Sequence, residues 1–215
     1  MKKYILTALT ISLFINTTSF SQNEMRIGIN AGANYSKFRG NELIDETNAD
    51  FGFLAGVSLE YFLSEKFSLK TNLNFERKSI KKTSNNIVDF EGMPTGEIEI
   101  KTNYDYLVLP MLVKYKFNET SGFYVNGGPF LGYLLSNKSR AEGYDEDDFT
   151  SLSKKIDVGV SIGLGAKFQL TGKNELGIEL RNNLGLINTS DVEVYKDGSI
   201  KSNSLNLLLT WDFEI

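Results

Sequence analysis

The strongest constraint on the fold is an alternation of apolar and polar residues near the end of the chain. Between residues 203 and 215, Leu205, Leu207, Leu209, Trp211 and Phe213 occupy every second position, and most residues between them are polar. Successive side chains of a β-strand point to opposite faces. This period of two therefore predicts a strand with one apolar surface and one polar surface.

The same pattern recurs in eight segments along the chain. They cover residues 26–36, 51–62, 67–78, 103–116, 122–135, 154–168, 174–187 and 203–213. Three connections are short (63–66, 117–121 and 169–173) and four are long and polar (37–50, 79–102, 136–153 and 188–202), in strict alternation. Short turns on one side and long loops on the other are typical of outer-membrane barrels. The sequence therefore predicts an all-β fold, an eight-stranded antiparallel up-and-down transmembrane β-barrel.

Residues 1–21 are predicted to be a cleaved signal peptide. Lys2 and Lys3 precede an apolar run over residues 4–15, and residues 19–21 fit a small-x-small cleavage site. The run is shorter than the roughly 20 residues that a membrane-spanning helix needs, which favours cleavage over a retained anchor helix. Residues 22–215 then form one domain, the barrel.

The alternation also separates the two faces of the predicted barrel. Outward positions are aliphatic in mid-strand and aromatic near both strand ends, as expected for a membrane belt between two interfaces. A soluble barrel or sandwich would explain the alternation, but not the aromatic bands or the unequal connections. Inward positions are rich in Gly, Asn and Ser and are punctuated by charge. The charges predicted to lie in the lumen are Glu60, Lys70, Glu76, Lys114, Asp157, Lys167, Glu179 and Arg181.

An eight-stranded barrel has an interior that side chains can fill. If the turn at 63–66 is tight, Glu60 falls opposite Lys70 on the neighbouring strand. Paired charges of both signs predict a structural plug, whereas a lining of one sign would indicate ion selectivity. Pro110 and Pro129 lie inside the fourth and fifth segments and cannot donate to the ladder, so a shared bulge or kink is expected there.

Two neighbouring segments resemble a known family. Residues 109–117, Leu-Pro-Met-Leu-Val-Lys-Tyr-Lys-Phe, are similar to a strand of the PorT-like outer-membrane β-barrel family, and residues 122–135 are similar to the next strand. Residues 28–38, 52–78, 157–168 and 176–190 also resemble it. The resemblance implies an eight-stranded barrel in the outer membrane of a Gram-negative envelope, without a catalytic motif. One member type of the family assists a protein-secretion and gliding apparatus.

The composition argues against most kinds of catalytic site. The chain has no histidine and no cysteine, which excludes imidazole and thiolate nucleophile pairs and the metal sites built from them. We therefore predict no enzymatic activity, no cofactor and no metal. The net charge is -4 without a basic cluster, which argues against binding of nucleic acid. The acidic residues between 142 and 148 can stay solvated or bind Ca²⁺, although their spacing is not that of an EF-hand.

We expect a non-enzymatic outer-membrane barrel with a polar, largely plugged lumen and a structural or secretion-accessory role in the cell envelope. Two alternatives stay open: a small solute channel, and a surface adhesin or receptor that acts through the long loops. The expected partners are outer-membrane lipid, the barrel-assembly machinery during insertion, and an envelope or secretion-complex protein.

Overall fold

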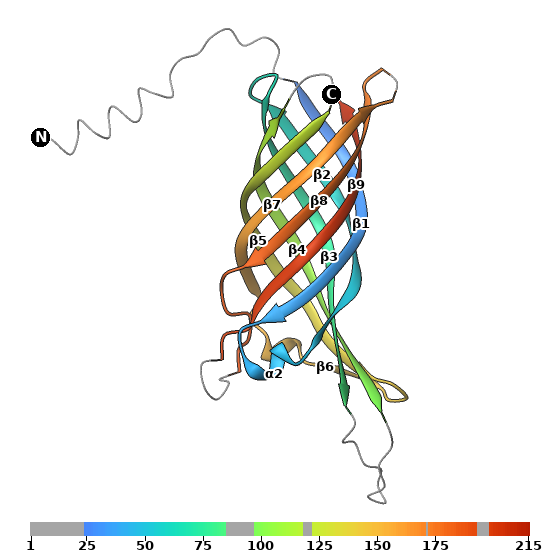
Figure 1. The fold of residues 1–215 in the computed structure, drawn as a ribbon, viewed down its shortest axis with the longest axis vertical. Helices are drawn as coiled ribbons and strands as arrows, with labels where there is room; N and C mark the ends of the chain where they lie inside the picture. The colour runs from blue at the N-terminus through green and yellow to red at the C-terminus, as the bar shows by residue number, and fades with distance from the viewer. Residues whose placement is uncertain (1–23, 85–96, 118–121, 171, 193–197) are drawn as a thin grey trace, which may run out of the picture.

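The computed structural model describes residues 24–84, 97–117, 122–170, 172–192 and 198–215, and the predicted signal peptide lies outside these ranges. Eight long strands form one closed antiparallel barrel (Figure 1). They are β1 (Met25–Arg39), β2 (Asn48–Phe62), β3 (Phe67–Ser84), β4 (Ile98–Lys116), β5 (Phe123–Ala141), β7 (Ile156–Gln169), β8 (Asn174–Gly185) and β9 (Lys201–Glu214).

Neighbouring strands in the chain are also neighbours in the barrel. The order β4-β3-β2-β1-β9-β8-β7-β5 is closed by the pairing of β4 with β5. The first and last strands pair along their whole length, from Arg26 opposite Glu214 to Arg39 opposite Lys201. The predicted fold class, an eight-stranded antiparallel up-and-down barrel, is confirmed.

The two faces of the wall follow the alternation in the sequence. In β9, Leu205, Leu207 and Leu209 face outward and are exposed, while Asn206 and Thr210 face inward and are buried. Outward aromatic rings pair with one another near both ends of the strands. The pairs are Tyr35–Phe51 and Phe53–Phe75 toward the long loops, and Phe67–Tyr115 and Trp211–Phe213 toward the short turns.

Three strands extend furthest beyond their predicted ends on the loop side. β3 continues to Ser84, β4 begins at Ile98, and β5 continues to Ala141, where the short strand β6 (Glu146–Asp148) pairs with it. We call residues 79–84, 98–105, 136–141 and β6 the flap. Figure 1 shows the β3–β4 part of the flap projecting beyond the rest of the barrel at the bottom of the view.

Two short helices lie on the loop side, α2 (Glu42–Asp45) and the 3-10 helix η1 (Thr150–Leu152). The backbone N–H of Ile44 donates to the Oδ1 atom of Asn41 over 2.8 Å, which caps the start of α2. The Ile44 side chain packs with Phe38 and Ile80 in a buried cluster, so α2 covers the loop end of the barrel (Figure 1). Within the described ranges, no helix is long and apolar enough to span a membrane.

The prolines do not produce the predicted bulge. The pairing of β4 with β5 keeps one register on both sides of Pro110 and Pro129, and its only recorded shift lies between Asp105 and Tyr106. The expectation of a bulge at the prolines was therefore wrong, while a kink there stays a prediction. The hydroxyl of Thr71 donates to the Pro110 carbonyl over 2.8 Å, which supplies a hydrogen bond beside the interrupted ladder.

Candidate functional site

The candidate site is the lumen, which contains all eight charges predicted for it. All eight are buried or nearly so, and the most exposed is the Lys167 side chain, at 8 %. The structure thus places together Glu60, Lys70, Glu76, Lys114, Asp157, Lys167, Glu179 and Arg181, as the alternation predicted. Their structural role stays a prediction.

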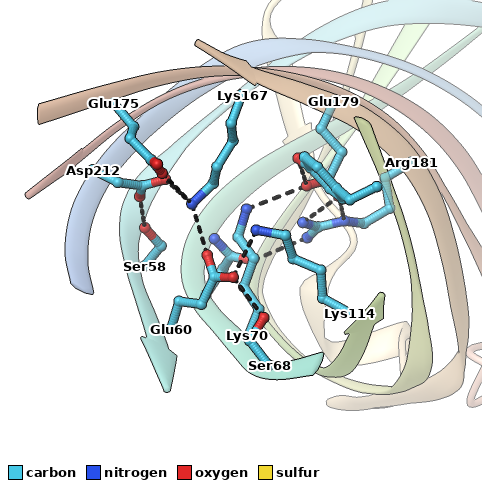
Figure 2. A network of polar contacts seen from close by, with 12 residues as sticks. Ser58, Glu60, Ser68, Lys70, Lys114, Lys167, Glu175, Glu179, Arg181 and Asp212 are labelled. Carbon is cyan, nitrogen blue, oxygen red and sulfur yellow. Dashed lines mark hydrogen bonds and ion pairs between the residues drawn. The ribbon is translucent and has the colours of Figure 1, made fainter. Parts of the chain in front are cut away.

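The group nearest the short turns is the Lys167 cluster, formed by Lys167, Glu60, Lys114, Glu175 and Asp212. The Nζ atom of Lys167 lies 2.7 Å from a Glu60 oxygen, 3.2 Å from Glu175 and 2.9 Å from Asp212. The other Glu60 oxygen accepts from Lys114 over 2.6 Å. Figure 2 shows these side chains converging from strands on different sides of the barrel. The cluster therefore ties together the turn end of the lumen.

Further up the lumen, Glu179 connects three neighbours. It accepts from Lys70 over 3.2 Å and from Arg181 over 2.6 Å (Figure 2). It also accepts from the Tyr124 hydroxyl over 2.8 Å. Arg181 also donates to Asn72 over 3.2 Å. Arg181 therefore crosses the lumen from β8 to β3, and Gly163 and Gly165 of the neighbouring strand β7, which pair with Arg181 and Glu179, leave room beside these long side chains. We call this group the Glu179 cluster.

A third group of lumen charges, the pair of Lys78 and Asp157, lies closer to the loops. Lys78 is 3.2 Å from Asp157, which also accepts from the Ser202 hydroxyl over 2.5 Å. The Lys78 ammonium also stands 4.7 Å from the ring centre of Tyr106 and 5.5 Å from that of Phe130. This pair therefore marks the boundary between the charged part of the lumen and an aromatic part.

Glu76 differs from the other lumen carboxylates. It is 1 % exposed, and its recorded partner is Asn183, which donates to it over 3.4 Å. In the described part of the chain, no cation lies within ion-pair distance of Glu76. Glu76 therefore lies in the lumen as predicted, but without the ion pair expected for a lumen charge.

Two apolar clusters lie at the loop end of the lumen, beside buried polar side chains such as Ser36 and Ser202. Tyr106, Val108, Phe130 and Leu134 form one fully buried cluster. A second cluster, of Phe38, Ile44 and Ile80, lies beyond it under α2, and Tyr104 packs against both. Inward positions were predicted to be polar and these clusters were not expected, although the same alternation places their strand residues on the inward face.

The partners of the lumen charges differ from those that strand pairing alone suggests. Glu60 does stand opposite Lys70 in the register of β2 with β3. Its ion pairs, however, are with Lys114 and Lys167, while Lys70 pairs with Glu179 across the lumen. Five further lumen residues were not predicted, although all follow the inward alternation of their strands: Arg26, Lys78, Tyr124, Glu175 and Asp212.

Among the acidic residues between 142 and 148, Glu146 and Asp148 form exposed pairs with nearby side chains. Glu146 pairs with Lys138 over 3.1 Å and with Arg140 over 3.7 Å. Asp148 accepts from Thr150, and these hydrogen bonds hold the pKa of the Asp148 carboxyl below its usual range. Across the residues that the structure describes, no group of three or more Asp or Glu side chains is arranged to hold a metal ion.

A family model described as "Outer membrane protein beta-barrel domain" matches residues 20–191. No curated protein matches the chain significantly. Similar solved structures include the attachment invasion locus protein Ail of Yersinia pestis, at 12% identity over 88% of this chain and 99% of that chain, with a TM-score of 0.44. The outer membrane protein OprG from Pseudomonas aeruginosa is similar at 12% identity over 89% of this chain and 96% of that chain, with a TM-score of 0.41.

Proposed function

Because the chain belongs to the outer membrane protein beta-barrel domain family, we propose that it is a non-conducting, non-enzymatic barrel with a structural or secretion-accessory role. The protein lies in the outer membrane, with its short turns toward the periplasm and its long loops outside. Within the family, we assign it to the PorT-like branch on the strand sequences at residues 109–117 and 122–135. Its proposed partner is an envelope or secretion-complex protein.

The observation that supports this proposal is the filling of the lumen at successive heights. The Lys167 cluster and the Glu179 cluster cross the turn-side half with ion pairs whose side chains are nearly all buried. Beyond them, the apolar cluster around Phe130 and the helix α2 fill the loop-side half. A hydrated ion would have to displace both paired charges and packed rings, so the resting barrel is expected to be closed.

Planar-bilayer recording of the refolded protein tests whether the barrel is closed. The parent protein should show only rare, small openings in symmetrical potassium chloride. As a control for correct insertion, a variant with Lys70, Glu179 and Arg181 all replaced by Ala should conduct more than the parent. A steady and sizeable conductance of the parent would instead establish the solute channel as the function.

The secretion-accessory role requires a test in cells. Deletion of the gene should reduce export of secreted proteins while uptake of small hydrophilic dyes stays unchanged. Expression of the parent protein should restore export. Normal export combined with reduced dye uptake would contradict the accessory role and favour the channel.

The flap favours a surface receptor or adhesin as the second candidate. It extends beyond the barrel rim and exposes ion pairs, among them Lys81–Glu99 at 3.3 Å and Lys138–Glu146 at 3.1 Å. A variant that keeps the barrel but shortens the flap between residues 79 and 104 separates the two roles. Loss of surface attachment with normal export would support the receptor, and the reverse result would support the secretion-accessory role.

A further inference from the structure

The outer surface of the barrel has a polar hollow of about 360 Å³ at the loop end of its β8–β9–β1–β2 wall. These four strands are consecutive in the barrel, and Figure 1 shows β8, β9 and β1 side by side on the near wall. The residues used in the argument are Tyr35, Lys37, Asn48, Asn182, Asn203 and Leu205. We call this feature the outer hollow.

The outer hollow has the chemistry of an anion site. Lys37 is the only charged residue in its lining, and among the described residues Lys37 takes part in no ion pair. Asp50, close by on β2, is already paired with Lys101 over 2.6 Å. Asn182 donates to the Asn203 side-chain oxygen over 2.8 Å and to the Ser204 carbonyl over 3.2 Å, which fixes the Asn203 amide beside the lysine with its NH2 group available. One cation, a tyrosine hydroxyl and the amides of Asn48 and Asn203, without a carboxylate, suit a phosphate group.

The depth of the outer hollow matches the headgroup layer of a bilayer. Tyr35 belongs to the loop-side aromatic band, where its ring lies 4.9 Å from that of Phe51, and such bands mark the membrane–water interface. Lys37 is the next outward position beyond Tyr35 on β1. Leu205, on the opposite side of the hollow, is the first of the outward leucines of β9. The hollow thus stands where lipid phosphates lie.

A row of small outward side chains, which we call the trough, leads from the hollow toward the middle of the membrane. Ala33 lies between Leu207 of β9 and Phe53 of β2, and Ala31 lies between Leu209 and Ala55. Below these alanines is a second, apolar hollow of about 520 Å³, lined by Ile27, Ile29, Val57, Leu59, Leu73 and other residues. From Tyr35 to Ile27 the strand advances about 26 Å at 3.3 Å per residue. At a tilt of about 45° this is roughly 19 Å of depth, enough for an acyl chain in one leaflet.

We propose that this wall binds a lipid with an anionic, phosphate-bearing headgroup from the outer leaflet. The headgroup phosphate contacts Lys37 and the amides of the outer hollow, and one acyl chain follows the alanines toward the apolar hollow. This site is independent of the lumen and of the proposed secretion-accessory role. It adds a specific lipid to the general lipid contact that any barrel makes.

Native mass spectrometry of the refolded barrel tests the proposal, with phosphatidylglycerol and phosphatidylcholine of identical chains as probes. The parent should retain phosphatidylglycerol in preference to phosphatidylcholine. Lys37→Ala should weaken retention of phosphatidylglycerol about five-fold, the effect of one lysine near an anionic headgroup. Lys66→Ala, which removes an exposed lysine in a periplasmic turn, should leave retention unchanged.

A second pair of variants tests the trough. Ala33→Phe fills it and should reduce retention of both lipids, whereas Val160→Phe places the same ring on the outward face of β7 and should have no effect. Heat-modifiable gel mobility verifies that each variant is folded. Trp211, the only tryptophan, faces outward beside Ile29 and provides a second readout through quenching by brominated lipids.

Equal retention of the two lipids by the parent, or equal losses in Lys37→Ala and Lys66→Ala, would overturn the proposal. Binding of inorganic phosphate without preferential retention of phosphatidylglycerol would also overturn it, because the occupant would then be a free anion. Stronger quenching of Trp211 by brominated phosphatidylglycerol than by brominated phosphatidylcholine, lost in Ala33→Phe and kept in Val160→Phe, would support it.

Discussion

The two halves of the lumen are filled in different ways by the same alternating wall. In the turn-side half, the Lys167 and Glu179 clusters fill the space with charged side chains that each need a partner at a defined position. In the loop-side half, the rings of Tyr106 and Phe130 and the α2 residue Ile44 fill it by packing. Alternation therefore decides that a side chain points inward, and not what kind of interior results.

The interiors of the two halves are equally shielded from solvent. Glu179 and Arg181 are at most 1% exposed, as are Phe38 and Tyr106. Exposure rises at the turn-side mouth, where the side chains of Arg26 and Glu214 are 14% and 27% exposed. The two halves therefore differ in what stabilises their buried side chains, which is ion pairing in one half and packing in the other. The difference predicts that single substitutions have unequal consequences in the two halves.

The largest effect is expected for Glu179→Ala. It leaves Lys70 and Arg181 buried without their carboxylate, which should lower the free energy of unfolding by about 5 kcal/mol. Arg181→Ala should have a smaller effect, because Lys70 and Tyr124 still donate to Glu179. Urea unfolding in lipid vesicles measures both, with the exposed loop variant Asp147→Ala as a control that should match the parent. Parent-like stability of Arg181→Ala and Glu179→Ala would show that the charged half does not stabilise the barrel.

Phe130→Ala tests the apolar half. It removes a fully buried ring from the cluster with Tyr106 and Leu134, and a loss of about 3 kcal/mol is expected from the cavity that remains. The same unfolding experiment measures it, with Phe130→Leu as a milder control. Unlike Glu179→Ala, this variant leaves no unpaired charge from a broken carboxylate pair. The decrease in the free energy of unfolding of Phe130→Ala should therefore change little with salt concentration.

The double variant Lys78→Met/Asp157→Leu examines the boundary between the halves. Replacing both members of a buried ion pair by apolar residues is often neutral or stabilising, so stability should stay within about 1 kcal/mol of the parent. Asp157→Leu alone should be clearly destabilising, because it leaves Lys78 without its carboxylate. A double variant as unstable as that single variant would mean that the boundary depends on the charges themselves.

The smallest effect is expected outside the lumen, at Lys82 and Glu46. Lys82 donates to Glu46 over 2.7 Å and holds the pKa of its carboxyl below the usual range. The pair favours the folded state above the unfolded pKa of Glu46, and that contribution disappears as the pH falls through the lowered folded pKa. Lys82→Ala should raise the pKa of Glu46 back toward its usual value in an NMR titration, with no measurable change in unfolding at neutral pH. An unchanged Glu46 pKa would contradict this assignment.

Much of this fold follows from local patterns in the sequence. The order of the strands, their turns and the inward position of Glu60 or Arg181 depend only on alternation along each strand. The pairing of Lys70 with Glu179 depends instead on the tilt and closure of the barrel, which bring together residues from distant strands. The flap and α2 were missed because their apolar residues, such as Ile44 and Ile80, lie in segments read as polar loops.

The distance in sequence between the paired charges has a consequence for assembly. Lys70 and Glu179 are separated by 109 residues, and Lys78 and Asp157 by 79. A growing sheet that had entered the bilayer without its last strands would carry these charges unpaired, at a high cost in hydrocarbon. Contacts of such long range form slowly. Incomplete sheets should therefore be unstable in the membrane. We expect the strands of this chain to insert together, with the lumen charges forming their pairs as the barrel closes.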